Sequence, residues 1–180
     1  MFIGARPVNA DDVAGFVGWR YEAPYDAYNL TRPLDEVLDY FLGPTTKCHG
    51  ILTDAGLGGY CTFGEDARVP GGDYQAAAVD IGAALKPELV GRGYGTEFVA
   101  AIIDCAILIF DPSMLRVSIS ASNLRAMKVW MSNGFNETQR FQAQEEMLET
   151  KEFVVFERSL AERGRRPEIL GLLSRGRHST

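Results

Sequence analysis

The sequence is poor in residues that bind metal ions or crosslink a chain. Its 180 residues include three cysteines and two histidines, namely Cys48, Cys61, Cys105, His49 and His178. No two of the cysteines have a CxxC spacing, and zinc sites need several such ligands close together, so we expect no metal site. An odd number of unpatterned cysteines indicates buried free thiols, as is usual in a reducing cytosol.

The sequence also lacks an excess of positive charge and a long apolar run. Eighteen Lys and Arg against 24 Asp and Glu give a net charge of −6. Nucleic-acid-binding proteins usually carry a basic stripe, so we expect no nucleic-acid partner. The negative charge suits a cationic ligand, although solubility accounts for it equally well. The longest apolar run, 98–110, is interrupted by Asp104 and is too short to span a membrane. With no signal-peptide pattern at the start, we predict a cytoplasmic protein without a membrane partner.

Hydrophobic periodicity predicts a mixed α/β domain over 1–160, a usual length for one domain. A tail with five arginines follows at 161–180. Pro24 interrupts 20–29 too strongly for a continuous helix. The predicted strands are 1–6, 48–53, 57–63, 76–85, 115–121, 135–141 and 153–160, and the predicted helices are 10–19, 34–41, 96–110 and 124–133.

Two of these elements carry expectations about burial. The helix over 96–110 is apolar on every side, so we expect it to be buried all round. In the strand over 115–121, apolar residues alternate with Arg116, Ser118 and Ser120. This alternation predicts one face in the core and one wetter face.

Three glycines, Gly91, Gly93 and Gly95, stand directly before the helix over 96–110. Glycine permits positive φ and close backbone approach, so successive amide groups can converge on one anion. The start of the helix adds partial positive charge, and Arg92 adds a full charge. The pattern therefore predicts a pyrophosphate site, with a plain strand-to-helix turn as the alternative.

Two other phosphate-binding motifs do not fit this turn. A dinucleotide fingerprint requires glycine where Thr96 stands and belongs to an early βαβ unit. A P-loop requires lysine followed by Ser or Thr after its last glycine, and here Thr96 follows Gly95 with no lysine between them.

The stretch from Asp80 to Thr96, DIGAALKPELVGRGYGT, resembles the fourth strand and coenzyme-A loop of GCN5-related N-acetyltransferases (GNAT). It is most similar to the branch of ribosomal-protein N-terminal acetyltransferases. The stretch from Asn123 to Trp130, followed by NGF at 133–135, resembles the family's second motif in the same register. The likeness covers roughly 48–160. It implies a GNAT fold, in which a central mixed, mostly antiparallel twisted sheet has helices on both faces.

The resemblance also implies how a coenzyme would bind. Acetyl-CoA would be the acyl donor, with no metal. Backbone groups of Ala83 and Leu85 would pair with the pantetheine arm as an added strand does. Asn123 would contact the arm, or it would only cap a helix. The pyrophosphate would be held around six consecutive residues, Gly91, Arg92, Gly93, Tyr94, Gly95 and Thr96.

The sequence departs from the family pattern at three positions. Val90 replaces a usual Gln or Arg, which removes one phosphate contact. Trp130 replaces a frequent tyrosine that is a proposed acid toward the thiolate, and indole cannot donate a proton at neutral pH. It would instead line the coenzyme site. Asp80 is a candidate base. Carboxylates that act as the base in some relatives lie on this strand in phase with Val79 and Ile81. Asp80 is offset from them by one residue, so we expect it to face the other side of the sheet.

Candidates for the acceptor side lie in 19–29, which resembles the acceptor region of the family. Glu22 and Asp26 could bind or deprotonate an amine, and Tyr21, Tyr25 and Tyr28 could form the pocket wall. Ordinary aromatic packing with solvated acids is the alternative. His49 is a weaker candidate for the base.

The leading hypothesis is an N-acetyltransferase in which a primary amine attacks acetyl-CoA directly in a ternary complex. A catalytically silent acyl-CoA sensor and a pure interaction domain are the alternatives. The acceptor could be a small-molecule amine or a protein N-terminus. A homodimer is compatible with the sequence, which does not define the oligomeric state.

Overall fold

The computed structural model describes residues 1–144 and 152–160, so the predicted tail lies outside the described residues. The described residues form one twisted sheet in the order β1-β2-β3-β4-β5-β7-β6. Its strands are β1 (Phe2–Pro7), β2 (His49–Thr53), β3 (Gly56–Phe63), β4 (Val79–Leu85), β5 (Met114–Ser120), β6 (Asn136–Gln142) and β7 (Glu152–Ser159). Only β4 and β5 pair in parallel, which confirms the prediction of a mixed, mostly antiparallel sheet.

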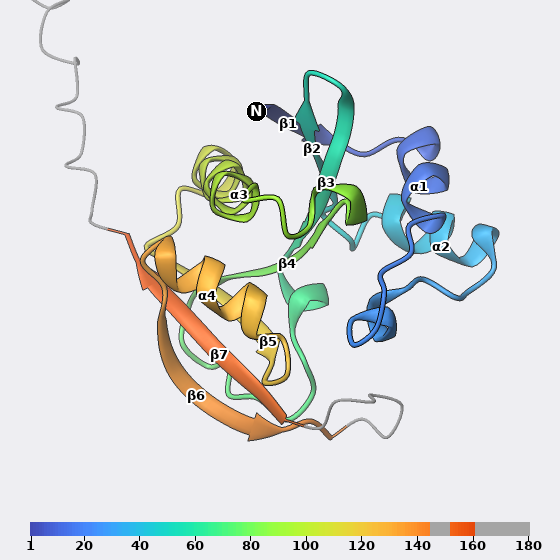
Figure 1. Cartoon of the computed structure of the whole chain (residues 1–180). Coiled ribbons are helices and arrows are strands. Elements are labelled where there is room, and N and C mark those ends of the chain that lie inside the picture. Colours follow the sequence, from blue (N-terminus) through green and yellow to red (C-terminus); the bar gives the residue numbers. More distant parts are fainter. Residues whose placement is uncertain (145–151, 161–180) are drawn as a thin grey trace, which may run out of the picture.

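Helices cover both faces of the sheet (Figure 1). Helices α1 and α2 lie on one face, while α3 and α4 lie on the other. Their bounds are α1 (Ala10–Val17), α2 (Leu34–Leu42), α3 (Gly95–Phe110) and α4 (Leu124–Ser132), and short 3₁₀ turns are η1 (Asp26–Tyr28), η2 (Glu65–Ala67) and η3 (Pro87–Leu89). The expected GNAT-type arrangement of sheet and helices is confirmed.

Side-chain caps explain where two of the helices begin. The Asn9 side chain accepts a hydrogen bond from Asp12 N at 2.9 Å, and the Asp12 carboxylate accepts one from Asn9 N at 2.9 Å. This reciprocal pair is a capping box, which satisfies amide groups that the first turn leaves free. Asn123 likewise accepts from Ala126 N at the start of α4.

The expectation that α3 is buried on every side is wrong. Its buried residues, such as Phe98 and Ile102, form the main core with the sheet. Leu108 is 87% exposed and Ile109 is 43% exposed. The helix lies on the outside of the sheet, so only one of its faces meets the core.

The expectation of a wetter face on β5 is also wrong, because Arg116 and Ser120 are buried. The chain between η2 and β4 covers this face, and the Tyr74 ring lies 4.9 Å from the Arg116 guanidinium carbon. Strand β4 begins at Val79, later than predicted. The carbonyl of Ala76 instead accepts a hydrogen bond from Arg116 at 3.1 Å.

A buried ion pair joins β4 to β5. Asp80 and Arg116 are register partners on the two strands. Arg116 Nε lies 2.5 Å from Asp80 Oδ1, and its Nη2 lies 3.1 Å from Asp80 Oδ2. Arg68 adds a contact from its Nε to Asp80 Oδ2 at 2.7 Å. The two-pronged geometry and the second arginine compensate a carboxylate that is only 2% exposed.

Strands β4 and β5 separate one register pair after this ion pair. Their pairing is confined to Val79, Asp80 and Ile81 on β4. In the described residues, Gly82 to Leu85 therefore have a strand partner only on the β3 side. Lys86 N donates to Gly58 O on β3, and the backbone groups of successive residues point to opposite sides of a strand. Ala83 and Leu85 therefore present theirs to the open side.

We expect Asp80→Asn to lower the free energy of unfolding by about 3–5 kcal/mol, because Arg116 stays buried without its counter-ion. Denaturant unfolding followed by circular dichroism measures this change. The matched control is Glu137→Gln, which removes an exposed ion pair with Arg140 and should leave stability almost unchanged. Equal small effects in the two variants would contradict the proposed importance of the buried pair.

Candidate functional site

A cleft of about 500 Å³ lies where β4 and β5 separate, and we call it the channel. Its walls come from β4, the glycine turn, the first residues of α3, helix α4 and the segment 21–28. The channel brings together most of the predicted site residues: Ala83, Leu85, Gly91, Gly93, Gly95, Thr96, Asn123 and Trp130 from the coenzyme set, and Tyr21, Tyr25 and Tyr28 from the acceptor set.

Glycine is needed at the three positions of the turn for two different structural reasons. Gly91 and Gly93 have φ of +77° and +87°, a region that other residues rarely adopt. No atom lies within 4 Å of a Cβ built on either one, so the space beside them is open. Gly95 begins α3, and a Cβ there would lie 2.9 Å from Val129 Cγ2. Gly95 therefore allows close packing of α3 against α4.

The start of α3 offers free amide groups to the channel. Tyr94 stands at the N-cap position, and no side chain caps the helix by a hydrogen bond. An uncapped helix start next to an open glycine turn is a suitable place for an anion. Arg92 and Tyr94 are exposed at this turn but do not line the channel, unlike the other residues of the predicted coenzyme turn.

The open edge of β4 is partly occupied. The Tyr21 hydroxyl donates a hydrogen bond of 2.8 Å to the Leu85 carbonyl, which was predicted to pair with the coenzyme. Burial raises the pKa of Tyr21 well above its ordinary value, and the negative charge of Glu88 adds to the effect. Ala83 is exposed, and its backbone faces the open side of β4.

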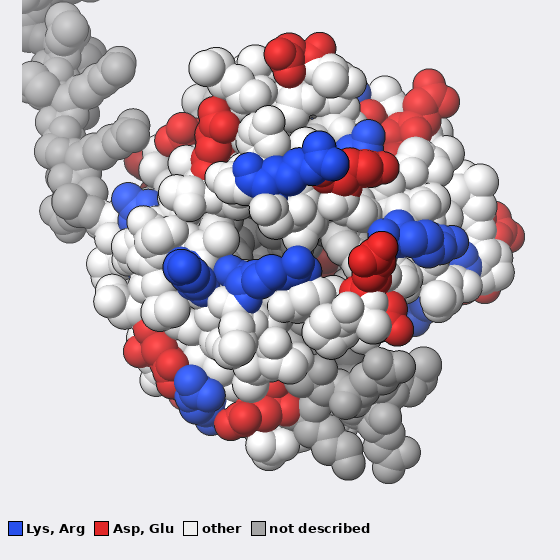
Figure 2. Space-filling model, in the orientation of Figure 1, with Lys and Arg blue, Asp and Glu red and all other residues white. Residues whose placement is uncertain are grey.

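Two cations of α4 that the sequence did not single out line the channel, Arg125 and Lys128. Figure 2 shows Lys and Arg side chains bordering a hollow at the centre of this face. The spacing of three residues places both cations on neighbouring positions of one helix surface, and the first of them stands two residues after Asn123. That spacing was the signal in the sequence by which these two cations could have been recognised. The two side chains supply positive charge where Val90 supplies none.

The segment 21–29 closes over the channel. Asn29 holds this segment as a loop, since its Oδ1 accepts from Tyr21 N at 2.7 Å and its Nδ2 donates to Tyr21 O at 3.2 Å. The Arg125 guanidinium carbon lies 3.7 Å from the centre of the Tyr25 ring. Asn123 Nδ2 donates to the Tyr28 hydroxyl at 3.3 Å. The predicted acceptor segment thus touches the predicted coenzyme elements directly.

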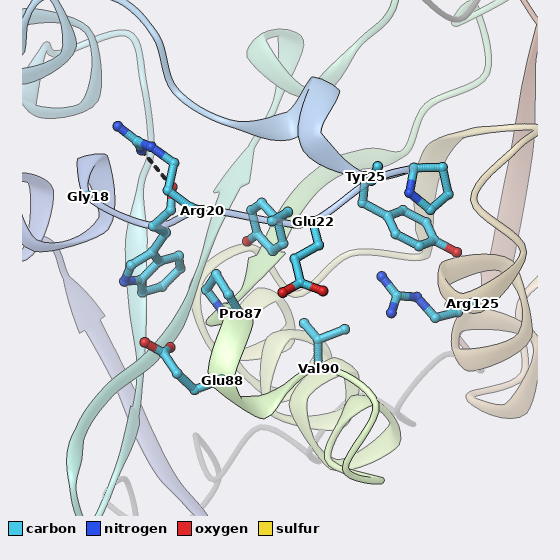
Figure 3. A pocket seen from close by; sticks show the side chains of 12 residues that line it. Gly18, Arg20, Glu22, Tyr25, Pro87, Glu88, Val90 and Arg125 are labelled. Atoms are coloured by element: carbon cyan, nitrogen blue, oxygen red, sulfur yellow. Dashed lines mark hydrogen bonds between the residues drawn. The ribbon is translucent and has the colours of Figure 1, made fainter.

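A second pocket of about 720 Å³ adjoins the channel, between residues 18–25 and the start of the glycine turn. Figure 3 shows the Glu22 carboxylate and the Arg125 guanidinium directed toward the space above Val90. Glu88, which the sequence did not single out, also lines this pocket. Neither glutamate forms an ion pair with another described residue. Both carboxylates are therefore available to a cationic ligand.

The other candidate acids and bases lie elsewhere. Asp26 begins η1 and lines neither the channel nor the second pocket. His49 lies on β2, with its ring 5.7 Å from that of Phe63, and also lines neither. Asp80 faces the opposite side of the sheet from Ile81 and is held by two arginines. We therefore assign Asp80 a structural role.

Trp130 forms part of the channel wall. Its side chain is 4% exposed, and its ring meets the Phe135 ring edge-on with centroids 4.8 Å apart. The position therefore provides an apolar surface that packs between the channel and the core.

The three cysteines are buried free thiols, as predicted. Burial raises the pKa of Cys48 to about 12, so this thiol stays protonated at neutral pH. Across residues 1–144 and 152–160, no group of three His, Cys, Asp or Glu side chains is placed to hold a metal ion. The same residues contain no helix long and apolar enough to cross a membrane.

Several solved structures share the fold of this chain. A chimera of Vibrio cholerae spermidine N-acetyltransferase SpeG and hSSAT has a TM-score of 0.69 and 13% identity, over 86% of this chain and 93% of that one. The aminoglycoside acetyltransferase AAC(6')-Ib, solved with coenzyme A, has a TM-score of 0.67 and 16% identity, over 87% and 94%. A GNAT-family acetyltransferase from Bacillus anthracis has a TM-score of 0.67 and 13% identity, over 88% and 98%.

At these identities the solved structures establish the fold. No curated protein sequence matches the chain significantly. The model of the acetyltransferase (GNAT) domain matches residues 3–136, well over half of the chain. The chain therefore belongs to the GNAT acetyltransferase family.

Proposed function

We propose that the protein transfers an acetyl group from acetyl-CoA to a primary amine, which attacks the thioester directly in a ternary complex. The observation that carries this proposal is the channel at the separation of β4 and β5. It joins an open strand edge to a glycine turn at an uncapped helix start. An extended arm and a pyrophosphate need these two features next to each other.

Different residues of the channel would bind different parts of the coenzyme. The amides of Gly91, Gly93 and the first turn of α3 would hold the pyrophosphate, with Arg125 and Lys128 adding charge that Val90 lacks. The backbone at Ala83 would pair with the pantetheine arm and polarise the thioester carbonyl. At Leu85 only the backbone amide is left to pair with the arm, because the carbonyl is bound to Tyr21. The thioester supplies the activated acetyl group and the leaving thiolate.

The second pocket is the acceptor site in this proposal. An amine with a pKa of about 10.4 is protonated at pH 7 and must lose a proton before it attacks. Glu22 would bind the ammonium group and take that proton, and Glu88 would add negative charge from the opposite side of Pro87 (Figure 3). Tyr21 and Tyr25 wall both the pocket and the channel, so the amine would meet the thioester where these cavities join.

We infer a small-molecule amine as the acceptor. By their names, two of the similar structures act on spermidine and on aminoglycosides. The finer likeness to ribosomal-protein N-terminal acetyltransferases finds no support among these structures. Thiol release from acetyl-CoA in the presence of a panel of amines and an N-terminal peptide tests the proposed activity.

A silent acyl-CoA sensor is the second candidate. The observation in its favour is Trp130, which stands in the channel wall and cannot exchange a proton at neutral pH. Tight coenzyme binding without turnover of any amine would support the sensor. Failure to bind coenzyme A would leave only an interaction domain.

We expect Gly93→Val to weaken acetyl-CoA binding by at least about tenfold, because a side chain at positive φ strains the turn and fills the space beside its amides. Isothermal titration calorimetry measures the affinity. Gly56→Val is the matched control, since Gly56, the first residue of β3, has φ of +106° and does not line the channel. Equal affinities in the two variants would remove the turn from the coenzyme site.

We expect Arg125→Gln to weaken coenzyme A binding by about 10- to 150-fold, the size of one lost hydrogen bond to a charged group. Arg92→Gln is the control and should have a smaller effect, because Arg92 does not line the channel. Titrations at low and high salt measure both, and the wild type should lose affinity more steeply with salt than Arg125→Gln. A larger loss in Arg92→Gln would contradict the assignment.

We expect Glu22→Gln to lower kcat/KM for an accepted amine by about 10- to 150-fold, while acetyl-CoA affinity stays unchanged. Asp26→Asn removes the same charge outside both cavities and should retain wild-type rates. If Glu22 takes the proton, the activity of its variant should recover as pH rises toward the pKa of the amine, where free amine forms unaided. Steady-state kinetics between about pH 6.5 and 9.5 test this, and wild-type rates in Glu22→Gln would exclude its role.

A further inference from the structure

Release of the coenzyme requires a proton donor in the channel. When an amine displaces a thioester, the departing sulfur carries a negative charge and must gain a proton to leave as a thiol. Trp130, in the channel wall, cannot provide it, because its indole N–H does not ionise near neutral pH. Four tyrosines line the channel, and each has a hydroxyl group to consider: Tyr21, Tyr25, Tyr28 and Tyr60.

The surroundings of three of these tyrosines make them unsuitable as the proton donor. The Tyr21 proton is already used in the hydrogen bond to Leu85 O. Tyr60 packs in an aromatic cluster, with its ring 4.4 Å from that of Phe16. Burial raises the pKa of Tyr60 and Tyr21 well above the ordinary value, so their phenolates are strongly disfavoured. Tyr25 turns its ring toward the Arg125 guanidinium.

Tyr28 differs from them in the direction of its hydrogen bond. The Tyr28 hydroxyl accepts a hydrogen bond from Asn123 Nδ2. The orientation of this amide is fixed, because Asn123 Oδ1 accepts from Ala126 N at 3.1 Å, so its nitrogen must face Tyr28. An amide nitrogen can only donate, which leaves the proton of Tyr28 free for another acceptor. Tyr28 is 44% exposed, so water can reach its hydroxyl group and return the proton.

We propose that Tyr28 is the acid that protonates the departing thiolate, and that Asn123 is the residue that positions it. The inference rests on the proposed acetyl transfer. The amine nitrogen forms its bond to the carbonyl carbon, and the C–S bond breaks with its electron pair going to sulfur. The O–H bond of Tyr28 then breaks as the S–H bond forms. The phenolate regains a proton from water, which receives the proton that the amine lost.

The decisive experiment uses coenzyme A itself and needs no acceptor. Coenzyme A labelled with ¹³C at the carbon bonded to sulfur is bound to the protein, and its chemical shift is followed as pH rises. A hydroxyl that donates to the thiolate stabilises the charged form and lowers the pKa of the bound thiol. Tyr28→Phe should therefore raise that pKa by about one unit or more, the size of one hydrogen bond to an anion.

Three further variants make the result specific. Tyr25→Phe and Tyr60→Phe should leave the pKa of the bound thiol unchanged. Asn123→Ala should raise it by less than Tyr28→Phe, because Tyr28 remains but loses its fixed position. With an accepted amine, Tyr28→Phe should lower kcat by about a hundredfold or more without changing the KM for acetyl-CoA.

The outcomes separate this inference from the proposed function. An unchanged pKa of the bound thiol in Tyr28→Phe, with coenzyme A still bound, would overturn the role of Tyr28 and leave acetyl transfer standing. A shift in Tyr60→Phe alone would assign the acid to Tyr60. If the wild-type protein does not bind coenzyme A, the proposed function itself fails, and the role of Tyr28 fails with it.

Discussion

A buried pair of opposite charges, Asp80 and Arg116, joins β4 and β5 one register pair before these strands separate. Parallel strands normally continue side by side, and here they separate after three register pairs. The ion pair holds the strands together beside the point of separation, because both side chains are almost completely buried and neither can leave the other without leaving a bare charge. The channel begins beyond this point, so its position in the sheet depends on the pair.

The second organising feature is the distribution of charge. The chain carries a net charge of −6, yet Arg125 and Lys128 stand together in the channel, while Glu22 and Glu88 stand in the adjoining pocket. An anionic coenzyme and a cationic amine would therefore each meet side chains of opposite charge on approach. Arg125 belongs to both cavities, and its guanidinium packs on Tyr25 at the point where they join.

The sequence predicted the elements that depend on local chemistry. Asn123 caps a helix by a bond to a residue three positions away, and Gly91 and Gly93 adopt the positive φ that the glycine turn suggested. It failed where the neighbours are distant in sequence. The alternation of β5 predicted water beside Arg116, whereas residues 64–78 cover that face. The bond from Tyr21 to Leu85 joins residues 64 positions apart, and no pattern around either residue indicates it. The turn and α4 were thus predictable as parts, but their closure by the tyrosine segment was not.

Asn29 has a consequence for how this protein can vary. By bonding to both backbone groups of Tyr21, it turns the intervening residues into a closed ring, on which Tyr25 and Tyr28 have fixed places. An insertion or deletion inside the ring would change its circumference and move every tyrosine hydroxyl at once. A change of length just outside it, between Asn29 and the start of α2, would leave the ring intact and alter only its connection to the fold. Engineering of the channel is therefore best directed at side chains within the ring. Changes of chain length are best made in the residues that follow the ring.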